Sequence, residues 1–539
     1  MRPTLDRQSF LRCAEQHRAT GRVVVIPVGV RLLSDQLTPV LAYRRLVTDD
    51  PREAPSFLLE SVEGGDRQGR FSVIGAHPAL ELIATRDALI RRDHRTGREE
   101  RQSTKDPLGA ARAITKGWML VRPSAGPRDP LPPCVLGGWF GYASYDSVRY
   151  AEPEKLGWET APPDDRGLPD VQFALYDRLV IFDHATKIVH VVCCIAVEPG
   201  SDASVAYDWA LDRLGATVEM LQVHSRPLPS GELLDGAAAP VAEASSNMTR
   251  ADHAAMVARA QEYIRAGDIF QVVVGQRFER TSAADPFDVY RALRVVNPSP
   301  YMAYMQAAGC ILIASSPEIL CRVRREKDGL RVTNRPLAGT RKRGDTAEDD
   351  ARLEAELRAD AKERAEHVML VDLGRNDVGV VADEGSVRLE SVMDVERYSH
   401  VMHLSSTVTG LVRPGLDAWD ALRAALPVGT ISGAPKIRAM QIIDELEPVR
   451  RGPYGGGFGY VDLGGEMDIA LALRTIVVPT AGRTDRGWPY HVQAAGGIVF
   501  DSRAEDEYLE TVNKAAAMHR AIDLAEHAFG MSGETSGQT

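Results

Sequence analysis

The stretch "RLVIFDHATKIVHVVCCIAV", residues 178–197, limits the possible folds most strongly, because two apolar runs flank a short polar segment. β-Branched and aromatic residues dominate both runs, and such residues favour strands. The polar "DHATK" between them is typical of a tight connection, so the stretch predicts a β-hairpin. The second run reads as a buried strand.

Shorter runs of the same kind occur throughout residues 1–224, namely "FLLESV", "RFSVIGA", "ALELIAT" and "VLGGWFGYASYD". Glycine and turn residues separate them, as in sheets with short connections. Beyond residue 247, helical and strand patterns alternate. The sequence therefore predicts a sheet-rich α+β protein.

The chain also divides by composition. Residues 225–247, "SRPLPSGELLDGAAAPVAEASSN", are rich in Pro, Ser, Ala and Gly, which is typical of a linker. We therefore expect one domain over residues 1–224 and a second over residues 248–527. Residues 528–539 are expected to form a disordered tail.

Helix signals are clear in the second part. Thr249 is a candidate N-cap with Asp252 three residues later, and Gly267 is a candidate stop. Apolar residues recur at helical spacing over residues 347–373, which predicts one long helix. A last helix is expected over residues 504–527.

Several classes of function are disfavoured by composition. The formal net charge is −11, whereas non-specific nucleic-acid binding rests on a basic surface. The longest nearly apolar run, residues 188–197, is too short to span a bilayer. No signal-peptide pattern begins the sequence, and the six cysteines form no CxxC pair. We expect a cytoplasmic protein without a nucleic-acid or membrane partner.

Two carboxylate pairs are candidates for a metal site. Glu363 and Glu366 are three residues apart on one predicted helix, and Glu507 and Glu510 share that spacing on another. Carboxylates from two helices could jointly hold Mg²⁺, which prefers oxygen ligands and keeps several waters. The same spacing is equally that of solvated helix faces with internal ion pairs.

Other candidate positions lie in loops and strands. "PVGTISGAPKIRAM" and "RGPYGGGFGY" are glycine-rich, but neither matches a P-loop or a dinucleotide fingerprint, and glycines also serve plain turns. Glu318 stands behind a proline at a strand entry, and His403 lies in a strand, where histidine is more often structural. "RPLAGTRKRG", residues 335–344, packs four cations around a small neutral centre.

In order along the chain, these segments resemble the chorismate-binding enzyme family. The motifs that carry the resemblance are "GDIFQVV", "NPSPYM", "SSPE", "RPLAGTRKRG", "AEHVMLVDLGRND", "YSHVMH", "GTISGAPKIRAM", "YGGGFGY" and "EYLETVNKA". They cover residues 249–524 densely. "LLES", "GRFSVIG" and "GWFGYASYDSVRYAE" extend the resemblance more thinly into the first part. The resemblance implies two antiparallel-sheet-rich parts with helices packed around the sheets.

The resemblance also implies roles for individual residues. Glu366 and Glu510 would hold Mg²⁺, which grips the ring carboxylate of chorismate. Glu318 would protonate the departing ring hydroxyl, and His403 would assist at the ring proton or in pyruvate loss. The implied substrate contacts are Gly339, Thr340, Thr430, Tyr454, Arg474, Ala495, Gly496 and Gly497, among which Arg474 suits a carboxylate through its bidentate guanidinium.

The reaction within the family follows from two positions. Relatives that make aminodeoxychorismate place a nucleophilic lysine where Ala338 stands. Relatives that make isochorismate or salicylate place a water-activating lysine at the position of Gln271. The remaining attacking species is ammonia, so the resemblance implies formation of anthranilate. Another chorismate aminase, such as aminodeoxychorismate synthase component I, and a non-catalytic regulator of the same fold are the alternatives.

The resemblance further implies partners and control. Ammonia would come from glutamine through a glutamine amidotransferase subunit. L-Tryptophan would inhibit by binding between the two domains, at a site framed by Ser61, Pro300, Tyr301 and Met302.

Four positions at three places depart from the family's usual sequence. Gly275 stands where serine is common, and Val380 stands where arginine is common. Ala495-Gly496 replaces the usual Gly-Ala, and this pair lies beside the expected substrate.

Overall fold

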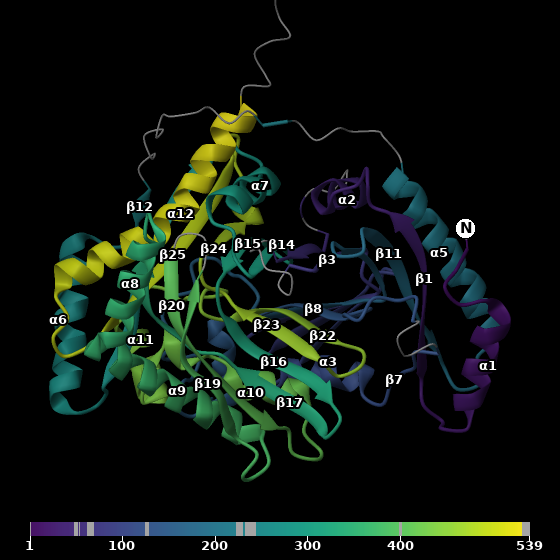
Figure 1. The fold of residues 1–539 in the computed structure, drawn as a ribbon, viewed down its shortest axis with the longest axis horizontal. Coiled ribbons are helices and arrows are strands. Elements are labelled where there is room, and N and C mark those ends of the chain that lie inside the picture. Colours follow the sequence, from purple (N-terminus) through teal and green to yellow (C-terminus); the bar gives the residue numbers. More distant parts are fainter. Residues whose placement is uncertain are drawn as a thin grey trace, which may run out of the picture.

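Two large β-sheets packed face to face form the centre of the protein (Figure 1). The computed structural model describes residues 2–47, 52, 54–61, 69–123, 129–222, 230–231, 244–397 and 401–530. Phe57 of one sheet stacks on Phe140 of the other, with ring centroids 4.2 Å apart. The largest hydrophobic cluster includes this contact between the sheets, where stacked aromatic rings contribute beyond their buried area.

In the described residues, the first sheet is antiparallel except where β1 pairs with β7. Its strands are, in spatial order, β12 (Ser245–Ser246), β13 (Gln271–Ser282), β25 (Trp488–Ile498), β24 (Thr475–Pro479), β15 (Cys310–Ser316), β14 (Tyr301–Ala307), β2 (Ser56–Glu60), β3 (Phe71–Ala76), β10 (Arg178–Asp183), β11 (Ile188–Val197), β1 (Val24–Leu33) and β7 (Met119–Leu120), and β21 (Gly433–Ala434) pairs with β13.

The second sheet is antiparallel throughout its described strands. They are, in spatial order, β18 (Leu337–Lys342), β20 (Val401–Leu411), β17 (Gly329–Asn334), β16 (Ile319–Glu326), β23 (Met467–Leu471), β22 (Gly457–Asp462), β8 (Gly138–Ala143), β9 (Val171–Tyr176), β4 (Leu80–Thr85), β5 (Ala88–Asp93) and β6 (Glu99–Ser103), and β19 (Arg388–Arg397) pairs with β20. Both sheets contain strands from both sides of the expected linker, because β2 pairs with β14 and β8 pairs with β22.

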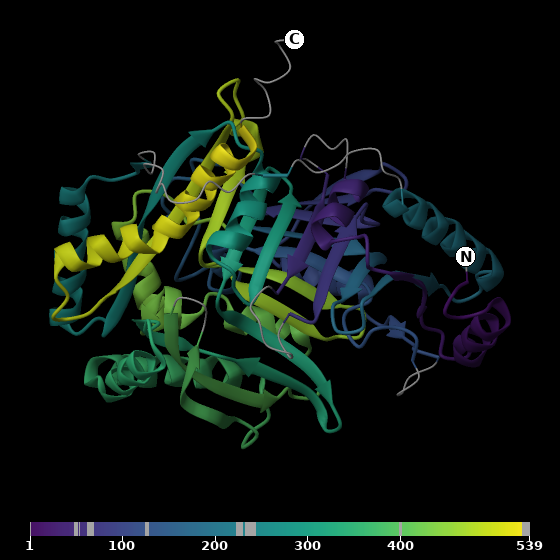
Figure 2. The same cartoon turned by 45° about the horizontal axis from the view of Figure 1, so that its top comes forward.

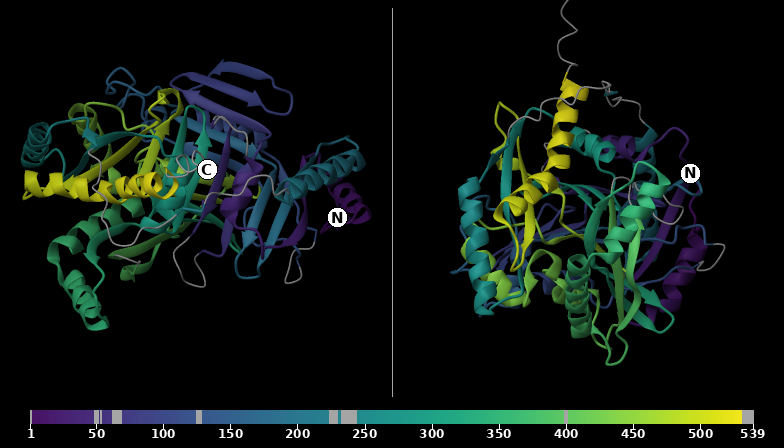
Figure 3. Two further views of the ribbon diagram at one scale, coloured as in Figure 1. Left: turned by 90° about the horizontal axis from the view of Figure 1, so that it is seen from above. Right: turned by 60° about the vertical axis from the view of Figure 1, so that its left-hand side comes forward.

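Helices cover the outer faces of the sheets. They are α1 (Arg7–Arg18), α2 (Pro39–Leu46), α3 (Pro107–Thr115), α4 (Val148–Ala151), α5 (Ala203–Gln222), α6 (Arg250–Ala266), α7 (Pro286–Val296), α8 (Ala347–Ala359), α9 (Ala361–Val381), α10 (Ala418–Ala425), α11 (Lys436–Leu446) and α12 (Ala504–Gly530), with 3₁₀ turns η1 (Tyr145–Ser147), η2 (Gly429–Ile431) and η3 (Thr480–Gly482). α5 packs on β11, and α12, yellow in Figure 2, packs on β25. Figure 3 shows α1 and α5 at the end of the molecule opposite α6.

Side chains that alternate along a strand belong to two different hydrophobic clusters. On β2, Phe57 faces the cluster between the sheets, whereas Leu58 faces the cluster under the helices. Successive side chains of a strand point to opposite faces, so both faces of this sheet are buried. This explains why its strands read as continuous apolar runs rather than as alternating ones.

Local signals in the sequence correspond to the observed elements. The hairpin over residues 178–197 is present as β10 and β11, which pair antiparallel from Arg178↔Cys193 to Asp183↔Ile188. The capping box of Thr249 and Asp252 begins α6, and Gly267 ends it in the left-handed conformation with φ 81°. Both predictions are confirmed because they rest on local chemistry.

The expected single helix over residues 347–373 is wrong. The structure has two helices there, α8 and α9, separated by Asp360 in an extended conformation. The Asp360 carboxylate accepts the N–H groups of Lys362 and Glu363, so this residue caps a new helix instead of continuing the old one. α9 then runs past Gly374 to Val381.

The expected linker and tail are described only in part. Of residues 225–247, the structure describes 230–231 and 244–247, and Ser245–Ser246 form β12. α12 continues through Gly530, three residues past its expected end, and the remainder of the expected tail lies outside the described residues. None of the helices that the structure describes is long and apolar enough to cross a membrane.

Candidate active site

Glu318 forms one side of the candidate site. It lies at the entry of β16, with its side chain buried, and accepts a hydrogen bond from Thr430 Oγ1 at 3.2 Å. Burial raises the pKa of Glu318 to about 8, against the lowering effects of Thr430 and of the backbone N–H of Leu337. The carboxyl group is therefore protonated at neutral pH and suited to donate a proton.

His403 lies close to the residues of "RPLAGTRKRG". It stands opposite Thr340 on the β18–β20 pair, and its Nδ1 lies 3.0 Å from both Gly339 O and Thr340 Oγ1. A carbonyl oxygen only accepts, so the ring proton is on Nδ1 and Nε2 keeps its lone pair. Burial and the charge of Arg474 lower the pKa of His403 to about 4. The ring is neutral at pH 7 and suited to accept a proton.

A bulge in β18 shapes this contact. The register shifts between Ala338 and Thr340, and Gly339 has φ 66°, a conformation that favours glycine. A Cβ at Gly339 would lie 3.0 Å from Leu357 Cδ1. The neighbouring Arg341 forms ion pairs with Asp360 and Glu363.

The two predicted metal carboxylates lie beside the same strand. A Cβ at Gly497 would be 3.8 Å from Glu366 Oε1, and one at Gly496 would be 3.9 Å from Glu510 Cδ. Glu366 Oε1 accepts a hydrogen bond from Gln271 Nε2 at 3.1 Å. Burial raises the pKa of Glu366, and the nearby charge of Glu510 contributes to the rise. The structure thus brings α9, α12 and β25 together here.

Other features of this acidic cluster bear on cation binding. Glu507 Oε2 is buried and has no hydrogen-bond partner among the described residues. Lys514 Nζ pairs with Glu510 Oε1 at 2.6 Å and donates to Ala495 O at 2.8 Å. No group of three or more His, Cys, Asp or Glu is arranged as a metal centre in the described ranges. Two carboxylates and an unsatisfied acceptor nevertheless suit a hard cation that keeps several waters, as Mg²⁺ does.

Tyr454 and Arg474 complete the candidate site. Tyr454 is buried, and the backbone of Ala495 hydrogen-bonds its hydroxyl, while burial raises its pKa. Arg474 lies between β23 and β24 with φ 46°, an uncommon conformation for a residue with a side chain. Such outliers persist only where their surroundings hold them, and they cluster at functional sites.

A separate cavity of about 610 Å³ lies between the two sheets. Ser61, Pro300, Tyr301 and Met302 all line it, so the structure brings the predicted regulatory residues together. Pro317 and Ile319 also line it, on either side of Glu318. The cavity and the candidate active site therefore share one strand as a wall.

Sequence reasoning did not place some contacts. Lys514 follows Glu510 at i, i+4 spacing, which is the spacing of the ion pair that the two side chains form. The Gln271–Glu366 hydrogen bond joins residues 95 positions apart, and no local pattern indicates it.

Comparison with known proteins places this geometry in a family. The chain is 51% identical over 523 residues to anthranilate synthase alpha subunit 1, chloroplastic, of Oryza sativa subsp. japonica, covering 94% of this chain and 89% of the relative. It is 46% identical over 505 residues to anthranilate synthase component 1 of Thermus thermophilus, covering 93% and 98%. The crystal structure of anthranilate synthase component I from Streptococcus pneumoniae superposes with a TM-score of 0.68 at 34% identity, covering 91% and 99%. The model of the chorismate binding enzymes matches residues 55–520, and the chain belongs to this family.

Proposed function

We propose that this chain is the aminating component of an anthranilate synthase. It converts chorismate and ammonia into anthranilate, pyruvate and water. One observation carries the choice of reaction: the neutral amide of Gln271 binds Glu366, where isochorismate-forming relatives have a lysine. Ala338, where a nucleophilic lysine would stand, is buried opposite Leu404 on the β18–β20 pair. Ammonia is then the attacking species.

Magnesium fits the acidic cluster. Glu366 and Glu510 would hold the ion, and Glu507 contributes a further acceptor beside Gly496. When bound, Mg²⁺ supplies positive charge that holds the ring carboxylate of chorismate and stabilises negative charge on it. Gln271 donates to Glu366 and thereby orients that carboxylate.

Two residues handle the protons of the reaction. Glu318 donates its proton to the ring hydroxyl, which leaves as water after ammonia attacks the ring carbon at position 2. His403 then accepts the proton from that carbon through Nε2 as the enolpyruvyl side chain leaves as an enolate and the ring becomes aromatic. A proton returned to the enolate gives pyruvate, and the proton that the added ammonia releases balances the one that Glu318 gave to the departing water. The raised pKa of Glu318 and the lowered pKa of His403 suit these opposite roles.

The remaining candidate residues bind and orient the substrate. Arg474 would bind the enolpyruvyl carboxylate, where a guanidinium forms two parallel hydrogen bonds. Tyr454 would contact the same end. The ring end would contact Gly339, Thr340, Thr430 and the backbone of Ala495, Gly496 and Gly497.

We further propose the partners and the control of the enzyme. Ammonia comes from a separate glutamine amidotransferase subunit of a cytoplasmic complex. L-Tryptophan binds the cavity between the sheets, where its amino-acid portion contacts Ser61. Because that cavity shares β16 with the active site, an occupant favours one arrangement of the strand and so changes activity.

Product identification tests the proposed function. Purified chain, chorismate, Mg²⁺ and ammonium salt are expected to give anthranilate fluorescence without any glutaminase. Isochorismate or aminodeoxychorismate as the main product would contradict the proposal.

A further inference from the structure

A buried guanidinium connects two parts of the candidate active site. Arg451 Nη1 donates to Ile431 O at 2.6 Å, and its Nη2 donates to Val273 O at 2.6 Å. Ile431 directly follows Thr430, the hydrogen-bond donor to Glu318. Val273 lies two residues beyond Gln271, the donor to Glu366. Arg451 thus binds the backbone of both segments that orient the proposed acid and the proposed metal carboxylate.

Glu447 fixes the direction of this guanidinium. Arg451 Nε donates to Glu447 Oε2 at 2.9 Å, and Nη2 donates to Glu447 Oε1 at 2.6 Å. Glu447 Oε1 also accepts the backbone N–H of Gly275 at 2.9 Å, which adds a second contact to β13. A bidentate pair restricts both partners to one geometry. We call Arg451 and Glu447 the buried pair.

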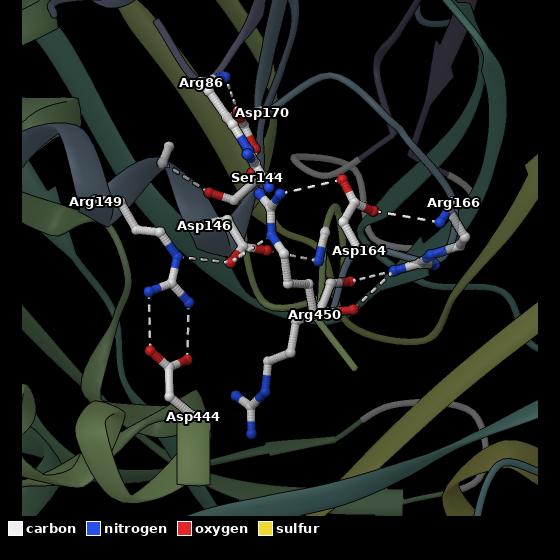
Figure 4. Close-up of polar contacts among 12 residues, drawn as sticks. Arg86, Ser144, Asp146, Arg149, Asp164, Arg166, Asp170, Asp444 and Arg450 are labelled. Atoms are coloured by element: carbon white, nitrogen blue, oxygen red, sulfur yellow. Dashed lines mark hydrogen bonds and ion pairs between the residues drawn. The ribbon is translucent and has the colours of Figure 1, made fainter. Parts of the chain in front are cut away.

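The segment that carries the buried pair is anchored on its other side. Arg149 and Asp444 form two hydrogen bonds of 2.8 Å, and Asp146 accepts the N–H of Gly452 at 2.9 Å (Figure 4). The Arg451 guanidinium also lies 4.6 Å from the ring centroid of Tyr145. Residues 144–149 of the first part therefore hold the segment from which Arg451 reaches the candidate site.

Stability alone explains the buried pair poorly. Arg451 is 2% exposed and Glu447 is 4% exposed, so both charges are removed from water. The desolvation cost of such a pair can exceed its Coulombic gain, and well-packed apolar residues are often as stable. An apolar pair could not bind the two backbone carbonyls, however. The feature that only the charged pair supplies is a fixed distance between the Thr430 turn and β13.

The geometry points to Arg451, held by Glu447, as a positioning residue that keeps Thr430 against Glu318 and Gln271 against Glu366. This inference rests on the proposed function, because Glu318 and Glu366 have their roles only there. Arg451 does not touch the reacting atoms. Its effect passes through the two segments whose carbonyls it binds.

The test variant is Arg451→Lys, which keeps the charge but carries three N–H donors on one atom instead of a planar fork. It therefore cannot reproduce the four hydrogen bonds to Glu447 and the two carbonyls. We expect kcat to fall by about 10–100-fold, as when groups that orient a reactive ligand are removed, with a smaller change in KM. The Thr430 hydrogen bond lowers the pKa of Glu318, so the alkaline limb of the pH–kcat profile should move to higher pH. Thr430→Ala should give the same movement. Combining Arg451→Lys with Thr430→Ala should move the alkaline limb little further than either change alone.

Arg280→Lys is the matched control. Like Arg451, Arg280 is a buried arginine, and it pairs with Asp523 and Glu526 of α12. It lies on β13, about 30 Å along the strand from Gln271. The Arg280→Lys variant should have lower thermal stability than wild type but an unchanged pH–kcat profile. Glu447→Gln keeps the side-chain size, provides a second variant if Arg451→Lys does not fold, and should move the limb in the same direction.

The inference is overturned if Arg451→Lys and Glu447→Gln lose stability as the control does but keep the wild-type kcat and profile. Failure of the proposed function would be seen separately, because the wild-type chain would then form no anthranilate from chorismate and ammonium.

Discussion

Gly275 and Ala495 face each other on the antiparallel pair β13 and β25, and a Cβ at Gly275 would lie 2.7 Å from the Ala495 Cβ. Real Cβ atoms essentially never approach so closely. The backbone of β25 comes closer still, since that Cβ would lie 2.3 Å from Ala494 O and 2.8 Å from Ala495 Cα. A side chain at Gly275 therefore clashes with the neighbouring strand whether or not Ala495 carries its methyl group, so this close pairing requires glycine.

This backbone clash predicts a double-mutant result. Gly275→Ser alone should destabilise the protein by about 1–3 kcal/mol through overpacking. Combined with Ala495→Gly, the serine should cost nearly as much, because its Cβ still lies 2.3 Å from Ala494 O. Denaturant unfolding of the two single variants and the double variant measures the coupling. Gly215→Ser, where a Cβ meets nothing within 4 Å, is the control for adding a serine side chain. A double variant in which Ala495→Gly recovers most of the stability lost through the serine would contradict the backbone clash.

The proposed metal ligands predict a loss of cation binding. Glu366→Gln or Glu510→Gln should lower kcat/KM by more than about 100-fold, because an amide is a poorer Mg²⁺ ligand than a carboxylate. This loss exceeds the one usually caused by changing residues that only hydrogen-bond to a metal ligand. Calorimetric titration with Mg²⁺ should show weaker binding in both variants. Glu505→Gln, an exposed change on the same helix as Glu510, should bind Mg²⁺ normally. Unchanged Mg²⁺ affinity in Glu366→Gln would remove that residue from the site.

The raised pKa of Glu318 predicts opposite effects on activity and stability. The folded state holds this proton up to about pH 8, whereas the unfolded state releases it near 4.5. Wild-type stability therefore falls with rising pH over this window, by up to ~1.4 kcal/mol per pH unit from this group. Glu318→Gln should lower kcat by about 10²–10⁴-fold. It should also gain stability relative to wild type between about pH 5 and about pH 8.

Thermal unfolding and steady-state rates across this pH range check both effects. Wild-type kcat should fall as pH rises through the pKa of Glu318, because the acid form is lost. A wild-type kcat that stays constant above that pKa would argue against Glu318 as the acid.

The cavity between the sheets predicts separable control. Ser61→Leu should fill the site beside Pro300 and Tyr301 and leave the rate without tryptophan nearly unchanged. The inhibition constant for L-tryptophan should rise at least about tenfold, the effect of losing ~1.4 kcal/mol of binding. Rates measured across a tryptophan titration decide the matter. Equal inhibition of the two proteins would place the regulatory site elsewhere.

The sequence predicted what depends on neighbouring residues. The capping box at Thr249 and the turn after Asp183 are local, and both are present in the structure. The spacing of apolar residues continues through Asp360, so the sequence predicted a single helix there. The break is caused by the capping hydrogen bonds of the Asp360 carboxylate, which only the structure shows. The continuity of the sheets across the linker was not predicted, because β2 and β14 are far apart in the chain.

The candidate site shows the same division. The resemblance to the family proposes roles for Glu318, His403, Glu366 and Glu510, and these roles stay predictions. The contacts that tune them were not predictable, since Arg451 reaches Val273 across 178 positions. Spacing indicates which groups share a helix face, but it does not indicate which strand passes beneath them.

Transfer of nitrogen from ammonia to chorismate is the central claim, and an isotope experiment tests it most directly. The purified chain is incubated with chorismate, Mg²⁺ and ammonium that carries the heavy isotope of nitrogen, and the products are weighed by mass spectrometry. The account predicts that all the anthranilate carries the label and that pyruvate, which contains no nitrogen, forms in an equal amount. Isochorismate, salicylate or anthranilate without the label would contradict it.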